Sequence, residues 1–375
     1  MVNGTGSRGL GENRIVSRWA LAGSLVVSSV VAASAPVTAA PALPEMTARV
    51  IDTYVVPRFA ELEASASKLA HNLRDVCEGK AGHLSEARTD FKDTALAWAK
   101  VEFLRFGPMS VTGRPERFSY WPDPRGVVQR QLRALVGRRD ATALDAEMLR
   151  DKSAAIQGLP ALEALLWNAK QPVTDTDEEG RYRCALATAI AQNLANISQD
   201  LSAGWGSSGE ARRRMLTPGP QNESYKTQAE PPAEFARALI TGLQMVQDRQ
   251  VAPLIAAETT PDKRPRLPFA ASGLSADYIA ASLASLRALY MAMDLSATVP
   301  KEKDWMPRWI TTAFKRLAED APAAVREEPS GGKDPERVRR LRFVRFHVEG
   351  IRKLVGRELA PLAGLMIGFN ELDGD

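Results

Sequence analysis

Apolar residues recur every three or four positions along most of this chain, which is the spacing of one face of an α-helix. Stripes of this kind cover residues 46–79, 85–106, 125–137 and 180–202, and again 233–256, 275–293, 304–319 and 335–360. No segment bounded by turn residues alternates apolar and polar positions in the way that a half-buried strand does. The pattern therefore predicts an all-α protein built from packed amphipathic helices.

One long stretch interrupts the helical pattern. Residues 203–233 are rich in glycine, serine, proline and charged side chains, a composition typical of a connection or a domain boundary. Amphipathic helices can bury their stripes only against neighbouring elements, so the helices on each side of this stretch need a core. We therefore expect two helical-bundle halves, at 40–205 and 233–375, joined by a linker over 206–232.

Proline also interrupts the pattern inside the first half. Pro57 lies within the first apolar stripe. It should kink or restart that helix, because proline lacks a backbone N–H and its ring clashes with the preceding turn.

The first 39 residues have the pattern of a signal peptide. Arg14 and Arg18 precede an apolar stretch rich in small residues, and the small-x-small pattern ending at Ala39 predicts cleavage after that residue. The apolar stretch is also close to the ~20 residues that span a bilayer, so a retained membrane anchor is the alternative. We expect an exported protein, which in a cell with two membranes would reside in the periplasm.

Charge adds little to this picture. The chain has 375 residues, a formal net charge of +4 and a sequence pI near 9.0. Arg8, Arg14 and Arg18 in the targeting segment carry part of that excess. No aromatic-basic motif of the RNA-binding kind is present. The sequence therefore gives no support for nucleic acid as a partner.

Cys77 and Cys184 are the only cysteines of the chain. Export to an oxidising compartment would permit a disulfide between them, joining a helix near the start to one far along the chain. Two buried thiols fit the sequence equally well. A metal site is poorly supported, because the two residues do not have Cys-x-x-Cys spacing.

Motifs of several common catalytic classes are missing. The three histidines, His71, His83 and His347, form no His-Glu-x-x-His motif of the kind that binds zinc in peptidases. The chain also contains no Gly-x-Ser-x-Gly elbow, no phosphate-binding loop and no dinucleotide fingerprint. Candidate chemistry therefore depends on individual polar residues near the breaks between helices.

Glu163 is the first candidate. It lies in QGLPALEALLWN, residues 157–168, one turn into a helix that Pro160 can begin, since proline suits the first helical turn. The positive end of the helix dipole favours a carboxylate there, so Glu163 could be only a helix-start residue. In the alternative interpretation, its carboxylate points into the bundle toward a partner base or a metal ion.

Two further segments supply candidates in the first half. Glu102 and Arg105 are three residues apart and could form an ion pair on one helix face. Trp121 and Asp123 lie in the proline-rigidified segment RFSYWPDPRG, where Asp123 could also cap the next helix.

The C-terminal part supplies two more. Asn370 and Asp373 in GFNELDGD resemble an oxygen-rich turn, although the segment falls short of the calcium-binding EF-hand pattern. The arginine-rich run PERVRRLRFVRFH, residues 335–347, is typical of a solvated helix face, with a membrane-surface or phosphate contact as the alternative.

Taken in order, five stretches resemble the imelysin-like family, also called peptidase family M75. They are WAKVEFLRFGP, RFSYWPDPRG with VVQRQLRAL, GLPALEALLW, GPQNESYKT and GFNELDGD. Their order and rough spacing match from about residue 46 to 375. The resemblance implies an exported, all-helical protein of two bundle-like halves. The family includes an insulin-cleaving outer-membrane protein, iron-regulated surface proteins and relatives of periplasmic iron-uptake components.

The hallmark of that family is a Gly-x-His-x-x-Glu motif, proposed to bind metal or act in catalysis. Gly158 and Glu163 match its glycine and glutamate, but Pro160 stands where the histidine belongs. Proline has no side-chain donor, acceptor or titratable group. The chain therefore resembles a subgroup that lacks the motif histidine, and the metallopeptidase role does not carry over by motif.

We accordingly expect a non-catalytic binding protein of the cell envelope, linked to iron or metal handling and peripheral to the outer membrane. Its partner would be a small ligand or an envelope protein. The expected site is a cleft between the two halves, formed by Glu163, Arg105, Trp121, Asp123, Asn370 and Asp373. The alternative is a metal-dependent peptidase with an altered ligand set, in which Glu163 binds a divalent metal or iron. A purely structural protein of the envelope is a third class.

Overall fold

The computed structural model describes residues 43–80, 83–111, 113–260, 265–326 and 334–368. Residues Ala40–Asp375 form one compact unit, separate from Met1–Ala39. The predicted signal peptide lies outside the described residues, as do Asn370 and Asp373. Every regular element in the described ranges is a helix, so the predicted all-α class is confirmed.

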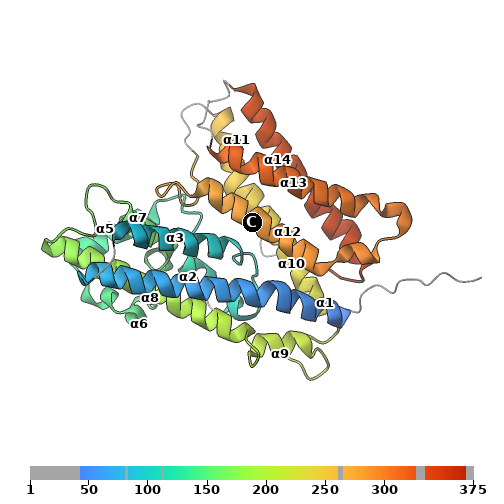
Figure 1. The fold of residues 1–375 in the computed structure, drawn as a ribbon, viewed down its shortest axis with the longest axis horizontal. Coiled ribbons are helices and arrows are strands. Elements are labelled where there is room, and N and C mark those ends of the chain that lie inside the picture. The colour runs from blue at the N-terminus through green and yellow to red at the C-terminus, as the bar shows by residue number, and fades with distance from the viewer. Residues whose placement is uncertain (1–42, 81–82, 112, 261–264, 327–333, 369–375) are drawn as a thin grey trace, which may run out of the picture. The chain divides into compact units, whose positions relative to one another are not determined.

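Three long helices organise the first part of the unit. The helix α2 packs along both α3 and α8, and the three run beside one another in Figure 1. The elements of this part are α1 (Leu43–Val50), η1 (Ile51–Val55), α2 (Val56–Cys77), α3 (Leu84–Ala99), η2 (Gly107–Ser110), α4 (Arg114–Phe118), α5 (Val127–Arg138), η3 (Ala141–Leu144), α6 (Ala146–Leu149), η4 (Ala154–Ile156), α7 (Leu159–Leu166) and α8 (Glu178–Trp205).

A second group of helices follows. The helix α13 packs between α12 and α14, and α12 also packs on α10 (Figure 1). The elements of this part are α9 (Glu210–Leu216), α10 (Glu230–Met245), η5 (Val246–Val251), α11 (Ala252–Thr259), α12 (Ser275–Met293), η6 (Leu295–Thr298), η7 (Lys301–Lys303), α13 (Trp305–Arg326), α14 (Pro335–Leu354), η8 (Val355–Leu359) and α15 (Ala360–Leu362).

The two groups share a hydrophobic core. One cluster of buried residues extends from α1 to η8. The helix α12 packs against α3, and α1 packs against α10 and α12, so contacts cross the segment that was expected to separate two halves. That segment, 206–232, contains the helix α9, and its role as a domain boundary stays a prediction.

Each of the three π-helical turns in the described residues precedes a proline. The turns η1, η5 and η8 end two residues before Pro57, Pro253 and Pro361 respectively. A proline inside an α-helix removes a hydrogen bond and crowds the carbonyl four residues earlier, and a wider turn moves that carbonyl away. The predicted break at Pro57 therefore takes the form of a widened turn between α1 and α2.

A disulfide joins Cys77, the last residue of α2, to Cys184 in α8, with a Cα–Cα distance of 5.5 Å. It therefore crosslinks two of the helices that pack most extensively. Within the described ranges, no helix combines the length and the apolar character that crossing a bilayer requires.

Candidate functional site

The break before α7 is shaped by Gly158, the residue that precedes the helix. A Cβ atom at this position would lie 2.3 Å from the carbonyl oxygen of Phe118, so only glycine allows this close backbone approach. Neighbouring side chains hold the segment before α7 in place. Arg117 donates to the Gln157 carboxamide at 2.9 Å, and Asn193 donates to the Gln157 carbonyl at 3.0 Å. Pro160 occupies the first turn of α7, as expected.

The Glu163 carboxylate points to the loop that precedes α12. Its Oε1 accepts hydrogen bonds from the backbone N–H of Ser272 at 2.8 Å and from the Ser272 hydroxyl at 2.6 Å. Burial raises the pKa of Glu163, and the hydrogen bonds from Ser272 and from the Ala271 backbone oppose that effect. The glutamate therefore holds a remote loop against α7.

The residues around this motif do not fit the metal site that the family implies. In the described part of the chain, no three histidine, cysteine, aspartate or glutamate side chains gather as a metal site requires. His71 lies 3.4 Å from Asp75 on the same helix, and His347 contacts the Phe343 carbonyl within α14. His83 and Glu86 have a His-x-x-Glu spacing, but Glu86 accepts from the His83 backbone N–H at the start of α3.

Trp121 and Asp123 line one cleft, of ≈ 940 Å³. Asp248 and Arg249 of η5 and Arg266 line the same cleft. The Asp123 carboxylate is not free, because it accepts hydrogen bonds from Val127 and Val128 at 2.8 and 2.9 Å. Asp123 thus satisfies the first two N–H groups of α5, the capping role that the sequence offered as an alternative, although the residue directly before the helix is Gly126.

Arg105 lines a different cleft, of ≈ 780 Å³, which we call the arginine cleft. Four guanidinium groups from separate parts of the chain line it: Arg105, Arg114, Arg214 and Arg237. Apolar side chains provide much of the remaining wall, namely Phe103, Phe106, Pro108, Val111, Met215 and Tyr225. Glu210 and Glu234 also line the arginine cleft, which thus combines four cationic and two acidic side chains with an apolar surface.

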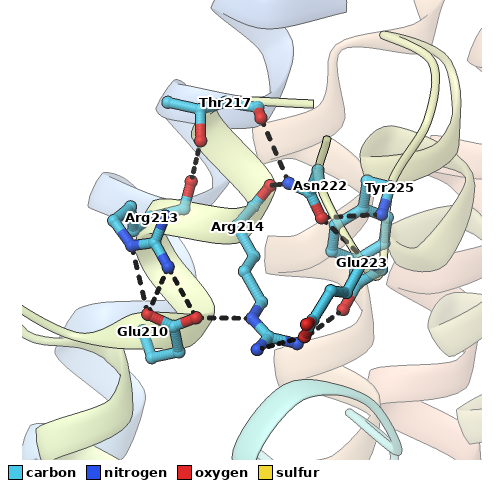
Figure 2. A network of polar contacts seen from close by, with 8 residues as sticks. Glu210, Arg213, Arg214, Thr217, Asn222, Glu223 and Tyr225 are labelled. Carbon is cyan, nitrogen blue, oxygen red and sulfur yellow. Dashed lines mark hydrogen bonds and ion pairs between the residues drawn. The ribbon is translucent and has the colours of Figure 1, made fainter. Parts of the chain in front are cut away.

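Each of these arginines also has a carboxylate partner. Arg105 pairs with Glu116 at 3.2 Å, Arg114 with Asp200 at 2.8 Å, and Arg237 with Glu234 at 2.7 Å. Arg214 pairs with both Glu210 at 2.6 Å and Glu223 at 2.9 Å, and Figure 2 shows it between the two. Arg237 keeps a buried Nε that has no hydrogen-bond partner among the described residues.

Asn222 holds the loop that contributes Ser224 and Tyr225 to the lining of the arginine cleft. Its amide nitrogen donates to the carbonyls of Arg214 at 2.7 Å and Thr217 at 3.1 Å (Figure 2). Its amide oxygen accepts from the backbone N–H of Tyr225 at 2.9 Å. This loop is the GPQNESYKT stretch, and burial raises the pKa of Tyr225, which lines the cleft.

Glu102 lies near Arg105 of the arginine cleft and near Arg249 of the cleft that contains Trp121. It is half-buried, and the Tyr278 hydroxyl bonds to its carboxyl group. Burial raises the pKa of Glu102, whereas Arg249, Tyr278 and Arg105 favour the ionised form. The expected Glu102–Arg105 ion pair does not form: Arg105 donates to the Glu102 backbone carbonyl at 2.7 Å and its guanidinium pairs with Glu116.

The structure therefore separates the candidates that the sequence grouped into one cleft. Trp121 and Asp123 lie together, Arg105 lines the arginine cleft, and Glu163 bonds to Ser272. Sequence reasoning missed Arg114, Arg214 and Arg237. In the sequence, only Arg214 could have been found, because it lies shortly before the GPQNESYKT stretch. Arg114 and Arg237 lie in helical segments without a recognisable motif.

Two solved structures share this fold. An imelysin-like protein from Psychrobacter arcticum 273-4 matches with a TM-score of 0.71 and 20% sequence identity, over 88% of this chain and 98% of its own. A protein from Parabacteroides distasonis ATCC 8503, described as a candidate iron-regulated protein A precursor, matches with a TM-score of 0.62 and 12% identity, over 86% and 96%. Identities this low show the fold alone. Among curated proteins, none matches the chain significantly.

The family description for imelysin, peptidase M75, matches residues 55–340. This range contains Gly158 and Glu163 and all residues that line the two clefts. Because the match covers most of the chain, this protein belongs to the imelysin family, peptidase family M75.

Proposed function

We propose that this protein is an exported, non-catalytic binding protein of the cell envelope, and that the arginine cleft takes an anionic ligand. The observation that carries the proposal is the convergence of Arg105, Arg114, Arg214 and Arg237 on one cleft with an apolar wall. A volume of ≈ 780 Å³ is in the range of small-molecule sites, which are mostly apolar with a few placed polar groups.

Three of the carboxylates that pair with these arginines are well exposed, whereas Glu234, the partner of Arg237, is only 24% exposed in its side chain. Glu116, Asp200 and Glu223 are 55%, 62% and 80% exposed in their side chains. A guanidinium group has five N–H donors, so a bound anion can share Arg105, Arg114 or Arg214 with its exposed carboxylate partner. A guanidinium group also binds carboxylate and phosphate through two parallel hydrogen bonds, which favours such anions as ligands.

Two features support binding over proteolysis. Pro160 offers no ligand atom where the family motif has histidine, and Glu163 already accepts two hydrogen bonds from Ser272. A zinc peptidase needs several nitrogen or carboxylate ligands that converge on one ion with an open position for water.

A link to iron forms part of the proposal. One relative of the same fold is described as a candidate iron-regulated protein A precursor. Citrate presents carboxylates with and without bound iron, so the arginines of the cleft could recognise either form by the same chemistry.

Export and cleavage after Ala39 also belong to the proposal. The disulfide between Cys77 and Cys184 supports an oxidising compartment, and the same relative is described as a precursor. N-terminal sequencing of the protein from the periplasmic fraction tests this point. A mature chain that starts at Ala40 is the expected result, and an intact N-terminus in the membrane fraction would favour the retained anchor.

Calorimetric titration with citrate, ferric citrate and inorganic phosphate tests the binding site. We expect saturable binding of at least one of these anions, and we expect Arg237→Ala to weaken it by about tenfold, which corresponds to ~1.4 kcal/mol. Arg213→Ala is the matched control, because Arg213 likewise pairs with a glutamate three residues earlier, Glu210, but does not line the cleft.

Three results would count against the proposal. Absence of saturable binding for all three anions, or equal weakening by Arg213→Ala and Arg237→Ala, would remove the arginine cleft as the site. Stoichiometric zinc or iron in the purified protein, lost in Glu163→Ala, would instead favour the metal-dependent peptidase.

A further inference from the structure

The helices α13 and α14 expose aromatic side chains on one surface. Trp305, Phe343 and Phe346 are 48%, 41% and 60% exposed. In the described part of the chain, no other tryptophan or phenylalanine is exposed. Isolated exposed apolar residues are common on proteins, but several aromatic residues gathered on one surface mark an interaction site.

Contacts across the two helices hold this surface in place. The Trp309 ring meets Phe346 edge-on, with ring centroids 6.4 Å apart, and stacks on His347 at 5.8 Å. Gly350 leaves room for Trp309, because a Cβ atom there would lie 2.3 Å from that ring. Trp305 lies one helical turn before Trp309, so the two residues share a face of α13. The aromatic surface therefore extends over both helices, which lie side by side in Figure 1.

Basic residues accompany the aromatic ones on α14. Arg342 precedes Phe346 by four residues and Lys353 follows it by seven, so all three share one helical face. Both cations are exposed, and neither has an ion-pair partner among the described residues. Arg339 and Arg345 differ in this respect, since Glu336 and Glu349 pair with them.

We propose that this face of α13 and α14, which we call the aromatic face, docks the protein on a membrane surface that contains anionic lipid. Aromatic side chains can enter the boundary between head groups and acyl chains while unpaired basic groups contact lipid phosphates. The aromatic face differs from the arginine cleft, because the arginines of the cleft line a cavity. Docking on the membrane therefore does not depend on which ligand the cleft binds.

The charge of the aromatic face argues against a second copy of this chain as its occupant. A two-fold symmetric dimer places the same patch on both sides of the interface. Such a contact would bring unpaired Arg342 and Lys353 together with the same residues of the other copy, and like charges in contact are unfavourable. An anionic lipid surface supplies the opposite charge.

Flotation with lipid vesicles tests the proposal. We expect the mature protein, which starts at Ala40, to float with vesicles of phosphatidylcholine and phosphatidylglycerol, to float much less with phosphatidylcholine alone, and to lose binding as salt is raised. Arg342→Ala with Lys353→Ala should weaken the vesicle affinity by at least about tenfold, since each basic residue near an anionic surface contributes ~1 kcal/mol. Phe343→Ala with Phe346→Ala should weaken it comparably.

Control variants keep the test specific. Arg130→Ala with Arg133→Ala removes the same charge from exposed positions of α5, and Met148→Ala removes an exposed apolar side chain elsewhere. Both should float like the unchanged protein, and all variants should keep its circular dichroism spectrum. The proposal fails if the protein does not bind anionic vesicles, if the control pair weakens binding as much as Arg342 and Lys353 do, or if the phenylalanine variants only abolish self-association in sizing experiments.

Discussion

Glu163 and Ser272 are 109 residues apart in sequence, yet one carboxylate oxygen of Glu163 accepts hydrogen bonds from both the backbone and the hydroxyl of Ser272. The Ser272 hydroxyl also lies 3.1 Å from the Phe269 carbonyl within the same loop. In this chain, the glutamate of the family motif therefore contributes to the tertiary fold, since it ties α7 to the segment that leads into α12.

Removal of the Ser272 hydroxyl should destabilise the protein moderately. We expect Ser272→Ala to lower the free energy of unfolding by ~1 kcal/mol, and Glu163→Ala to lower it by ~1–3 kcal/mol because the buried donors then lose their acceptor. Urea unfolding of both single variants and of the double variant measures the coupling. Strictly additive effects of the two substitutions would mean that the bond between the Ser272 hydroxyl and Glu163 contributes nothing to stability.

Gly158 should tolerate no side chain. Gly158→Ala brings a Cβ atom within 2.3 Å of the Phe118 carbonyl oxygen, so backbone must move, and we expect a loss of ~1–3 kcal/mol of unfolding free energy. Gly137→Ala is the matched control. Gly137 lies in the helix α5, and a Cβ atom at this position would have no other atom within 4 Å. Thermal unfolding should show Gly137→Ala unchanged or slightly stabilised by ~0.5–1 kcal/mol.

The disulfide should contribute strongly to stability. It closes a loop with a sequence separation of 107 residues. We expect Cys77→Ser with Cys184→Ser to lower the free energy of unfolding by ~2–5 kcal/mol. Urea titration with and without reductant checks the result: reductant should lower the midpoint of the unchanged protein and leave the double variant as it was. Two reactive thiols in the denatured, unreduced protein would contradict the bond.

Glu102 should make stability depend on pH. Burial raises its pKa in the folded protein, so the folded state binds the proton more tightly than the unfolded state does. The contribution of Glu102 is then fully present below the ordinary pKa of glutamate and is lost as pH rises through the raised value. The unfolding free energy of the unchanged protein minus that of Glu102→Gln should therefore fall across this interval. A difference that rises with pH would show that Arg249 and Tyr278 outweigh burial.

The helices were predictable because amphipathic stripes record which face each helix buries. The stripe over 275–293 coincides with α12, Ser275–Met293, and the one over 335–360 covers α14 and η8. The widened turn before Pro57 was not predictable, since the apolar periodicity of the sequence does not distinguish it from a kink or a restart of the helix.

The candidate site was less predictable, because its contacts join segments that are distant in sequence. Glu102 and Arg105 were assigned to one helix face by spacing, but α3 ends at Ala99, so helical spacing no longer applies to them. Their actual neighbours, such as Tyr278 and Glu116, are chosen by tertiary packing. Single positions such as Asp123 were predictable as caps because a cap depends on local backbone alone.

The π-turn at Ile51–Val55 lies between α1 and α2, and these two helices pack against different sets of neighbours. A π-turn holds one residue more than an α-turn, so the residues after it are rotated by about 100° relative to those before it. The buried stripe of α1 accordingly meets α10 and α12, while that of α2 meets α3 and α8. A single additional residue at this turn thus directs the apolar face of α1 toward α10 and α12 and that of α2 toward α3 and α8.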